Sequence, residues 1–366
     1  MKHIDLSKKY VRLFRFDGWN HSLNDNWMVS YKKRDGMILT LHNNTTFYIP
    51  EKVFNDNLRE GVEFISDDKK FNSYLDDYEN YMSDLQAGFS SEIKNKKSID
   101  LDSLNTFLHL MADVWQYFYK TEFYYLDKAC EFAEENEKIR KNLDILYKLK
   151  ERAKVETLNK SFWGSGSYFS IMLDTLSKQF EVPKKELENY GIDEIRDLYD
   201  GKRVNEETLK QRTVARIICI IDDRTSYLFG AEAEKEIMDF RKRTGDIIPY
   251  GAKSLQGTVT NKGTVTGKVK VIVSTPESID DIEGEFNKME KGDILVTETS
   301  TPELMPACVK AGAILADQGG LLSHAAVVSR ELGIPSIVAL KYATKIFQDG
   351  DIVEVDANEG IVKKIQ

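Results

Sequence analysis

The sequence has few cysteines and no long apolar segment. Three cysteines (Cys130, Cys219 and Cys308) stand far apart in 366 residues, without the paired spacing of a zinc site and in an odd number for disulfides. A reducing cytoplasm is therefore the predicted location, and Cys219, within an apolar run, is predicted to lie in a core. No apolar run reaches the roughly 18 residues of a membrane-spanning helix, and the N-terminal MKHIDLSKKY lacks the apolar stretch of a secretory signal.

Acidic residues outnumber basic ones in this sequence. The 51 Lys and Arg residues are outnumbered by 60 Asp and Glu residues, which gives a net charge of −9. Nucleic-acid-binding domains need a basic surface, so this balance argues against a nucleic-acid partner. The hydrophobic content of 41% and the charged content of 30% are typical of a globular protein and leave the function open.

Three segments differ in the pattern of their apolar residues. Residues 1–90 mix short β-favouring runs with turns and one helical stretch, which predicts a small α+β module. Residues 91–250 are mainly helical, and residues 254–366 alternate short strands with helices. The predicted fold class is a multidomain α+β protein, with a largely helical central domain followed by a compact α/β domain. Gly245, Pro249 and Gly251 lie in the predicted linker between these two domains.

Helical spacing dominates the central segment. An apolar stripe that includes Phe107, Met111 and Trp115 predicts a helix that Asp100 or Asp102 caps. The further helices are predicted over residues 126–158, 170–180, 183–189, 192–199 and 206–219. In the C-terminal segment, strands are predicted over residues 268–273, 293–296, 313–316, 337–338, 351–355 and 361–362, with helices over 302–311 and 323–332.

The most informative segment is DQGGLLSHAAVVSRELGIP, which follows the predicted strand that ends at Ala316. After the two-glycine turn, Ser323 stands at a helix N-cap and His324 at the first helical position. Gly333 stands where a C′ glycine ends a helix, and Pro335 prevents its continuation. The pattern therefore predicts a short helix with one imidazole at its positive end.

This placement suits an imidazole that carries a phosphoryl group. A neutral imidazole nitrogen is a competent nucleophile, and free amides and the dipole at a helix N-terminus favour the negative charge that a phosphoryl group adds. Gly319 and Gly320 would allow the backbone close to those oxygens, and the Ser323 hydroxyl would either donate to them or cap the helix. The alternative for His324 is a structural histidine at a helix start. The chemical interpretation requires a ring accessible to an incoming phosphate.

The run from Gly319 to Pro335 resembles the signature of the phosphohistidine (swivelling) domain of the phosphoenolpyruvate-utilising enzymes: phosphoenolpyruvate synthase, pyruvate phosphate dikinase and rifampin phosphotransferase. The resemblance extends in order over the whole C-terminal domain, through residues 255–257, 263, 267–269, 299–303, 349–351, 356 and 360. It implies that His324 accepts and donates a phosphoryl group and that Gly319, Gly320 and Ser323 form its supporting loop. Leu322 departs from the Thr of the synthase and dikinase and is more similar to the rifampin phosphotransferase group.

Three other positions belong to the same resemblance. Arg330 lies six residues along the helix and faces away from His324, so a structural ion pair or a docking contact is its predicted role. Ser300 and Thr301 follow a predicted strand and would either lie beside the phosphoryl group or cap the next helix. Of these two roles we favour capping.

The resemblance also shows what the chain lacks. The segment before residue 85 is too short for the family's ATP-grasp domain, and no glycine-rich loop followed by a lysine is present to hold a triphosphate. The chain ends eleven residues after Val355, so no phosphoenolpyruvate-binding barrel is expected after it. The resemblance thus implies that no cofactor or metal is bound in this chain. ATP and Mg²⁺ are expected on a partner subunit, an ATP-grasp protein or a phosphoenolpyruvate-using one.

The helical middle resembles, more loosely, the segment that precedes the phosphohistidine domain in rifampin phosphotransferase. The likeness rests on Tyr190–Ile195 and on Arg212, and in that family this segment binds the phosphoryl acceptor. A small-molecule acceptor is therefore implied, with candidate wall residues at His109, Trp115, Tyr119, Tyr124 and Trp163. The alternatives are that Trp115 and Tyr119 belong to a core stripe and that His109 is a structural histidine.

Two functions follow as hypotheses. In the first, the chain is the phosphocarrier and acceptor-binding component of a split phosphotransferase, in which a partner phosphorylates His324. In the second, it is a non-catalytic binding or regulatory module that retains the fold of the phosphohistidine domain, with or without phosphorylation of His324, while its N-terminal region reports to a partner. The retained loop around His324 favours the first, because a docking module would need the fold but not the nucleophile.

Overall fold

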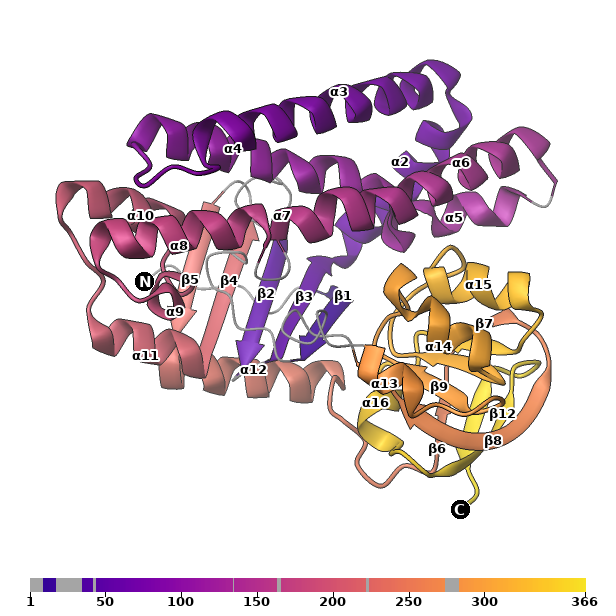
Figure 1. Cartoon of the computed structure of the whole chain (residues 1–366). Helices are drawn as coiled ribbons and strands as arrows, with labels where there is room; N and C mark the ends of the chain where they lie inside the picture. The colour runs from indigo at the N-terminus through magenta and orange to yellow at the C-terminus, as the bar shows by residue number, and fades with distance from the viewer. Residues whose placement is uncertain are drawn as a thin grey trace. The chain divides into compact units, whose positions relative to one another are not determined.

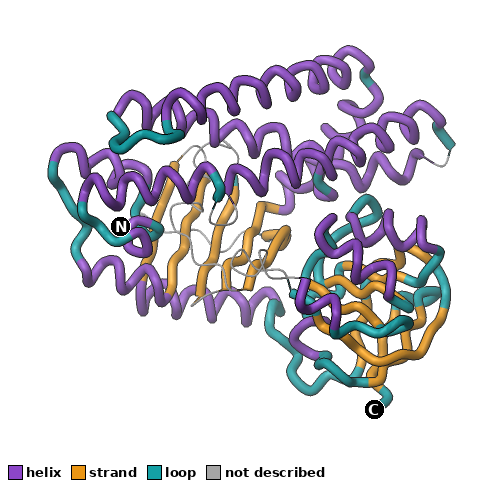
Figure 2. Tube along the Cα trace, in the orientation of Figure 1, coloured by secondary structure: helices purple, strands orange, loops and turns teal. Residues whose placement is uncertain are grey.

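The computed structural model describes residues 9–17, 35–41, 44–133, 135–162, 166–221, 224–273 and 283–366 (Figure 1). The chain divides into two compact units. Unit 1 is Met1–Thr121 with Lys141–Thr244, and unit 2 is Glu122–Arg140 with Gly245–Gln366. The predicted mixed α+β character with two sheets is confirmed (Figure 2). The division at residues 90 and 250 stays a prediction.

Unit 1 is built on a five-stranded antiparallel sheet in the order β1-β3-β2-β4-β5. Its strands are β1 (Tyr10–Asp17), β2 (Gly36–Leu41), β3 (Asn44–Pro50), β4 (Ala215–Ile221) and β5 (Arg224–Phe229). β4 pairs with β2 in the register Leu39↔Ile217, so segments far apart in the sequence form one sheet.

The predicted helix over residues 206–219 is wrong in its second half. Helix α11 spans Glu206–Val214, and the chain continues as strand β4. The run after Ala215 is rich in isoleucine, whose branched Cβ favours a strand, and pairing on both sides satisfies its backbone hydrogen bonds. Cys219 is buried as predicted.

Helices cover both faces of this sheet. On one face α12 (Gly230–Thr244) packs Ile237 and Phe240 against a cluster that includes Leu39 and Ile217. On the other, Ile38 and Ile218 form a second cluster with Trp115. Asp100 caps α4 (Leu101–Phe118), since its side chain accepts from Ser103 N at 2.8 Å.

The remaining helices of unit 1 follow the chain order. They are α2 (Glu51–Ser66), α3 (Asp68–Glu92), η1 (Tyr119–Thr121), α6 (Glu137–Ala153), η2 (Lys154–Asn159), α7 (Lys160–Phe162), α8 (Tyr168–Phe180), α9 (Lys184–Leu187), α10 (Ile192–Asp197) and η3 (Leu198–Asp200). The single helix predicted over residues 126–158 is wrong, because α5 (Phe123–Ala133), assigned to unit 2, ends before α6 begins.

Unit 2 contains an eight-stranded sheet in the order β6-β13-β12-β8-β9-β10-β11-β7. Strands β8 to β11 run parallel at its centre, and the pairs outside them are antiparallel. The strands are β6 (Ser254–Gln256), β7 (Thr258–Asn261), β8 (Thr264–Val271), β9 (Ile294–Thr297), β10 (Ala313–Ala316), β11 (Ser336–Val338), β12 (Ile352–Asp356) and β13 (Ile361–Lys364). The helices are α13 (Glu283–Asn287), η5 (Pro302–Leu304), α14 (Met305–Lys310), α15 (His324–Leu332) and α16 (Ala343–Ile346).

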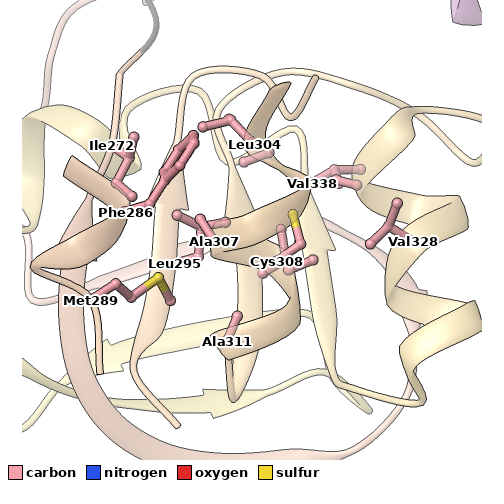
Figure 3. Close-up of a cluster of buried hydrophobic side chains, with 13 residues drawn as sticks. Ile272, Phe286, Met289, Leu295, Leu304, Ala307, Cys308, Ala311, Val328 and Val338 are labelled. Atoms are coloured by element: carbon pink, nitrogen blue, oxygen red, sulfur yellow. The ribbon is translucent and has the colours of Figure 1, made fainter. Parts of the chain in front are cut away.

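A buried apolar cluster holds the helices of unit 2 on this sheet (Figure 3). Ala325 and Val328 of α15 and Cys308 of α14 pack with Leu295 of β9 and with other buried side chains. Burial of such side chains contributes roughly 1.5–3 kcal/mol each, so the start of α15 is fixed against the sheet. Within the described parts of the chain, no helix has the length and apolar character needed to cross a membrane.

Candidate functional site

His324 is the first residue of α15, as the sequence predicts. Ser323 is the N-cap, and its side chain accepts from Ala326 N at 3.3 Å. Gly333 ends the helix in the left-handed conformation with φ of 66°. These are local interactions within a few residues, which explains why the pattern predicts both ends of the helix.

Ser300 meets the His324 ring. Its hydroxyl oxygen lies 2.6 Å from His324 Nδ1, and both side chains are buried. Ser300 follows β9 and the turn before His324 follows β10, so the carboxyl ends of two neighbouring parallel strands bring the pair together. Because Nδ1 is engaged, Nε2 is the ring nitrogen that would take a phosphoryl group.

Thr301, the residue after Ser300, has a different environment. Thr301 occupies the N-cap position of η5, but its side chain makes no capping hydrogen bond. Its hydroxyl is buried and has no hydrogen-bond partner in the described part of the chain. Capping, the role that the sequence analysis favours for Ser300 and Thr301, is therefore wrong for both side chains. The local pattern favours a helix cap because the residue that Ser300 contacts, His324, lies 24 residues further along the chain.

The expectation of an accessible ring is not met in this conformation. His324 is only 6% exposed. Cys308 lies beside the site, with its sulfur 3.7 Å from Ser300 Oγ, and burial raises the pKa of this thiol to about 11. The His324 ring is therefore largely shielded from solvent in this conformation.

The turn before His324 requires glycine at two positions for two different reasons. Gly319 has φ of 121°, and a methyl group there would lie 2.8 Å from Ser323 Cβ. A methyl group on Gly320 would lie 2.2 Å from Oδ2 of Asp127 on α5. The sequence analysis assigns both glycines to phosphate approach and does not find Asp127, for which no local signal exists.

Two polar contacts hold this turn in place, one made by a buried carboxylate and one by an exposed guanidinium. Asp317 accepts from Thr344 Oγ1 at 2.5 Å and from Thr344 N at 3.2 Å, and burial raises the pKa of its carboxyl. Arg330 donates to the carbonyl oxygen of Leu321 at 3.1 and 3.2 Å. Arg330 therefore supports the loop from the next turns of α15 through hydrogen bonds to the backbone, whereas the predicted ion pair or docking contact stays a prediction.

The predicted acceptor-binding residues do not form a common site. His109 is exposed, and its Nδ1 contacts Asn105 O of the same helix at 2.7 Å. Trp115 stacks on Phe162 at 5.5 Å and packs on the sheet, as the core alternative predicts. Tyr119 is half-buried in η1, Tyr124 is buried in α5, and Trp163 lies outside the described residues.

The residues that carry the looser resemblance bond to one another. Arg212 donates to both carboxylate oxygens of Glu194 at 2.6 and 2.8 Å and to Asn189 O at 2.8 Å. Glu194 also accepts from Gly191 N at 2.7 Å. Burial opposes the ionisation of Glu194, but these hydrogen bonds outweigh it and lower the pKa of its carboxyl. The guanidinium stacks on Phe229 at 4.7 Å, so this cluster joins α10, α11 and β5.

Comparison with known proteins places the site in a family. Residues 289–360 match the family model described as PEP-utilising enzyme, mobile domain. The chain is 45% identical over 131 residues to a probable phosphoenolpyruvate synthase of Archaeoglobus fulgidus, which is 36% of this chain and 15% of that protein. It is 35% identical over 139 residues to the phosphoenolpyruvate synthase of Escherichia coli, which is 38% of this chain and 17% of that protein. The chain thus spans less than a fifth of the length of these relatives.

Solved structures add little. Aconitase X of Thermococcus kodakaraensis matches 31% of this chain and 100% of its own, with 18% identity and a TM-score of 0.23. An Enzyme I solution structure covers 84% of this chain and 79% of its own, with 15% identity and a TM-score of 0.23. These scores are too low to bear on the fold or the function.

Proposed function

Because residues 289–360 match the mobile domain of the PEP-utilising enzymes, we propose that His324 carries a phosphoryl group between a donor protein and a small-molecule acceptor. The likeness of this domain to phosphoenolpyruvate synthases supports a phosphotransfer role. The observation that carries the proposal is the 2.6 Å contact between Ser300 Oγ and His324 Nδ1.

This contact selects one tautomer for the reaction. With Nδ1–H donating to Ser300 Oγ, the lone pair lies on Nε2, which is the nucleophile. In the loading step the Nε2–P bond forms while the donor's P–O bond breaks. In the unloading step an acceptor oxygen attacks phosphorus, the Nε2–P bond breaks, and the acceptor's proton passes to a base at the acceptor site.

The surroundings of the ring suit the added negative charge. The start of α15 presents backbone amides and the positive end of the helix dipole. The hydroxyl of Ser323, which accepts from Ala326 N, retains a proton that it can donate to a phosphoryl oxygen. The buried hydroxyl of Thr301 is a second candidate donor.

The proposal also includes the identity of the phosphoryl donor and the way in which the phosphoryl group reaches the acceptor. We expect a separate ATP-grasp protein, with ATP and Mg²⁺ bound there, or a phosphoenolpyruvate-using partner. The burial of His324 supports transfer by a domain that moves, because the ring must leave its present surroundings to meet each partner.

Intact-mass measurement tests the proposal. The full chain is incubated with the candidate partner and ATP, with phosphoenolpyruvate, or with phosphoramidate as a chemical donor. We expect a gain of one phosphoryl group that is acid-labile and base-stable and that maps to His324. His324→Gln should abolish the gain, whereas His109→Gln, a change at an exposed histidine, should not. No uptake at His324 from any donor would favour the non-catalytic binding module.

A further inference from the structure

Helix α5 meets the glycine turn through one carboxylate. A methyl group on Gly320 would lie 2.2 Å from Oδ2 and 2.6 Å from Oδ1 of Asp127. Both oxygens of Asp127 therefore lie against the backbone at Gly320, and a side chain at this position would require the Asp127 carboxylate to move. Residues 122–140, which contain α5, belong to the same compact unit as the glycine turn.

A second residue of α5 faces the same way. Cys130 lies three residues after Asp127, so the two side chains share one face of the helix. Burial raises the pKa of the Cys130 thiol to about 12; the charge of Asp127 also raises it, and that of Arg330 lowers it. Arg330 in turn holds the carbonyl of Leu321 in the glycine turn. This face of α5, Asp127 with Cys130, is called the α5 face below.

The chemistry of the two surfaces is complementary. The turn Gly319–Ser323 leads into the start of α15, where backbone amides and the helix dipole favour an anion. Asp127 supplies an anion at Gly320, four residues before His324 in the chain. A phosphoryl group on His324 would bring a second anion into the same surroundings, and the two would repel each other.

We propose that the α5 face is an internal docking surface for the turn Gly319–Ser323, and that a phosphoryl group on His324 displaces the Asp127 carboxylate from it. Only the displacement of Asp127 by the phosphoryl group rests on the proposed function; the docking of α5 does not. In the unphosphorylated chain α5 docks on the turn and restricts access to His324. In the phosphorylated chain α5 is released, which frees the loaded domain to seek its acceptor.

Cys130 is a built-in reporter of this docking. The rate of its alkylation by iodoacetamide is followed in the full chain by peptide mass spectrometry, and carbethoxylation of His324 by diethylpyrocarbonate is followed in parallel. Asp127→Asn keeps the shape and removes the charge, so we expect both rates to rise by about five-fold or more. Gly320→Ala, which adds the colliding methyl group, should raise Cys130 alkylation as well.

Matched controls separate undocking from unfolding. Glu131→Gln removes another charge that raises the pKa of the Cys130 thiol, from an exposed position of α5, so it measures the direct electrostatic effect on alkylation. It should leave carbethoxylation of His324 unchanged and raise Cys130 alkylation less than Asp127→Asn does. Cys219 and Cys308 are buried and should stay unreactive in every variant. If Asp127→Asn and Gly320→Ala react at the wild-type rates, the docking surface is wrong.

The displacement of Asp127 on phosphorylation is tested with phosphoramidate, which transfers its phosphoryl group to imidazole nitrogen with loss of ammonia. In wild-type chain phosphorylated at His324, we expect Cys130 alkylation to rise to the rate of Asp127→Asn. In Asp127→Asn itself phosphorylation should add no further increase. Phosphorylation at His324 with an unchanged Cys130 rate would overturn the displacement. If exposed His109 is phosphorylated but His324 is not, even in Asp127→Asn, the proposed function fails. The alkylation rates of Asp127→Asn and Gly320→Ala then test the docking of α5 by themselves.

Discussion

The two units differ in what their motif residues do. In unit 1 the residues that resemble rifampin phosphotransferase, Arg212 and Glu194 among them, bond to one another and join three elements. In unit 2 the residues of the matched motif lie around one histidine, His324, and a buried hydroxyl, that of Thr301, has no hydrogen-bond partner in the described part of the chain. A likeness in sequence can therefore record a structural cluster or a chemical site, and only the contacts distinguish the two.

Buried polar groups also have different roles in the two units. A bidentate ion pair such as Arg212–Glu194 contributes stability only as a complete pair, because either partner alone would be a buried charge. The hydrogen bond between His324 Nδ1 and Ser300 Oγ orients a ring, and in the proposed function it leaves Nε2 as the reacting nitrogen. We therefore expect changes in unit 1 to act on unfolding and changes around His324 to act on phosphoryl uptake.

The largest effect is expected for Arg212→Leu. The substitution leaves Glu194 partly buried without its guanidinium partner, and we expect unit 1 to lose about 3 kcal/mol of stability. Hydrogen exchange read peptide by peptide should show faster exchange in α10, α11 and β4. Lys210→Gln, at an exposed ion pair of the same helix, should change stability by less than about 0.5 kcal/mol. Equal effects of the two would show that the Arg212 cluster is not structural.

A matched change in unit 2 is Gly312→Ala. A methyl group there would lie 2.6 Å from the carbonyl oxygen of Gly292, which belongs to the backbone and cannot turn away. We expect a loss of about 2 kcal/mol, confined in hydrogen exchange to the strands of unit 2. Gly166→Ala has no neighbour within 4 Å and should be nearly neutral. Uniform loss of protection in both units would contradict their independence.

A smaller effect is expected for Ser300→Ala. Removal of the hydroxyl leaves Nδ1 without its fixed partner, so the reactive tautomer is no longer selected. We expect phosphoryl uptake at His324 to slow by roughly 10- to 30-fold, about 1.4–2 kcal/mol, with little change in unfolding. Ser300→Thr, which keeps the hydroxyl, should restore part of the rate. A fall in stability without a fall in rate would assign Ser300 to structure.

The smallest effect concerns pH. The pKa of Glu194 is lowered in the folded chain, so the pair stabilises unit 1 above the unfolded pKa of this carboxyl. That contribution is lost as pH falls through the lowered folded value. Because Glu194 is about one third exposed, we expect about 1 kcal/mol or less between pH 6 and pH 3. Chemical denaturation of wild type and Glu194→Gln over this range should converge at low pH, and parallel curves would exclude the linkage.

Local patterns predicted local structure well. The first and last residues of α15, the cap at Ser323 and the terminating Gly333 are as expected, because a cap involves residues within one turn. The strand β4 was predicted as helix, because its partner β2 lies in a distant part of the chain. The role of Thr301 as a helix cap was wrong for a similar reason, since nothing in its neighbourhood shows where its side chain points.

The sequence by itself determined that an imidazole stands at the start of a short capped helix after a glycine turn, since the residues concerned are neighbours along the chain. Only the tertiary structure decided what surrounds that imidazole. Ser300 reaches it from another strand end, Asp127 reaches the turn from α5, and the ring is buried. These contacts join residues far apart along the chain, and their geometry depends on how the strands pair and the helices pack.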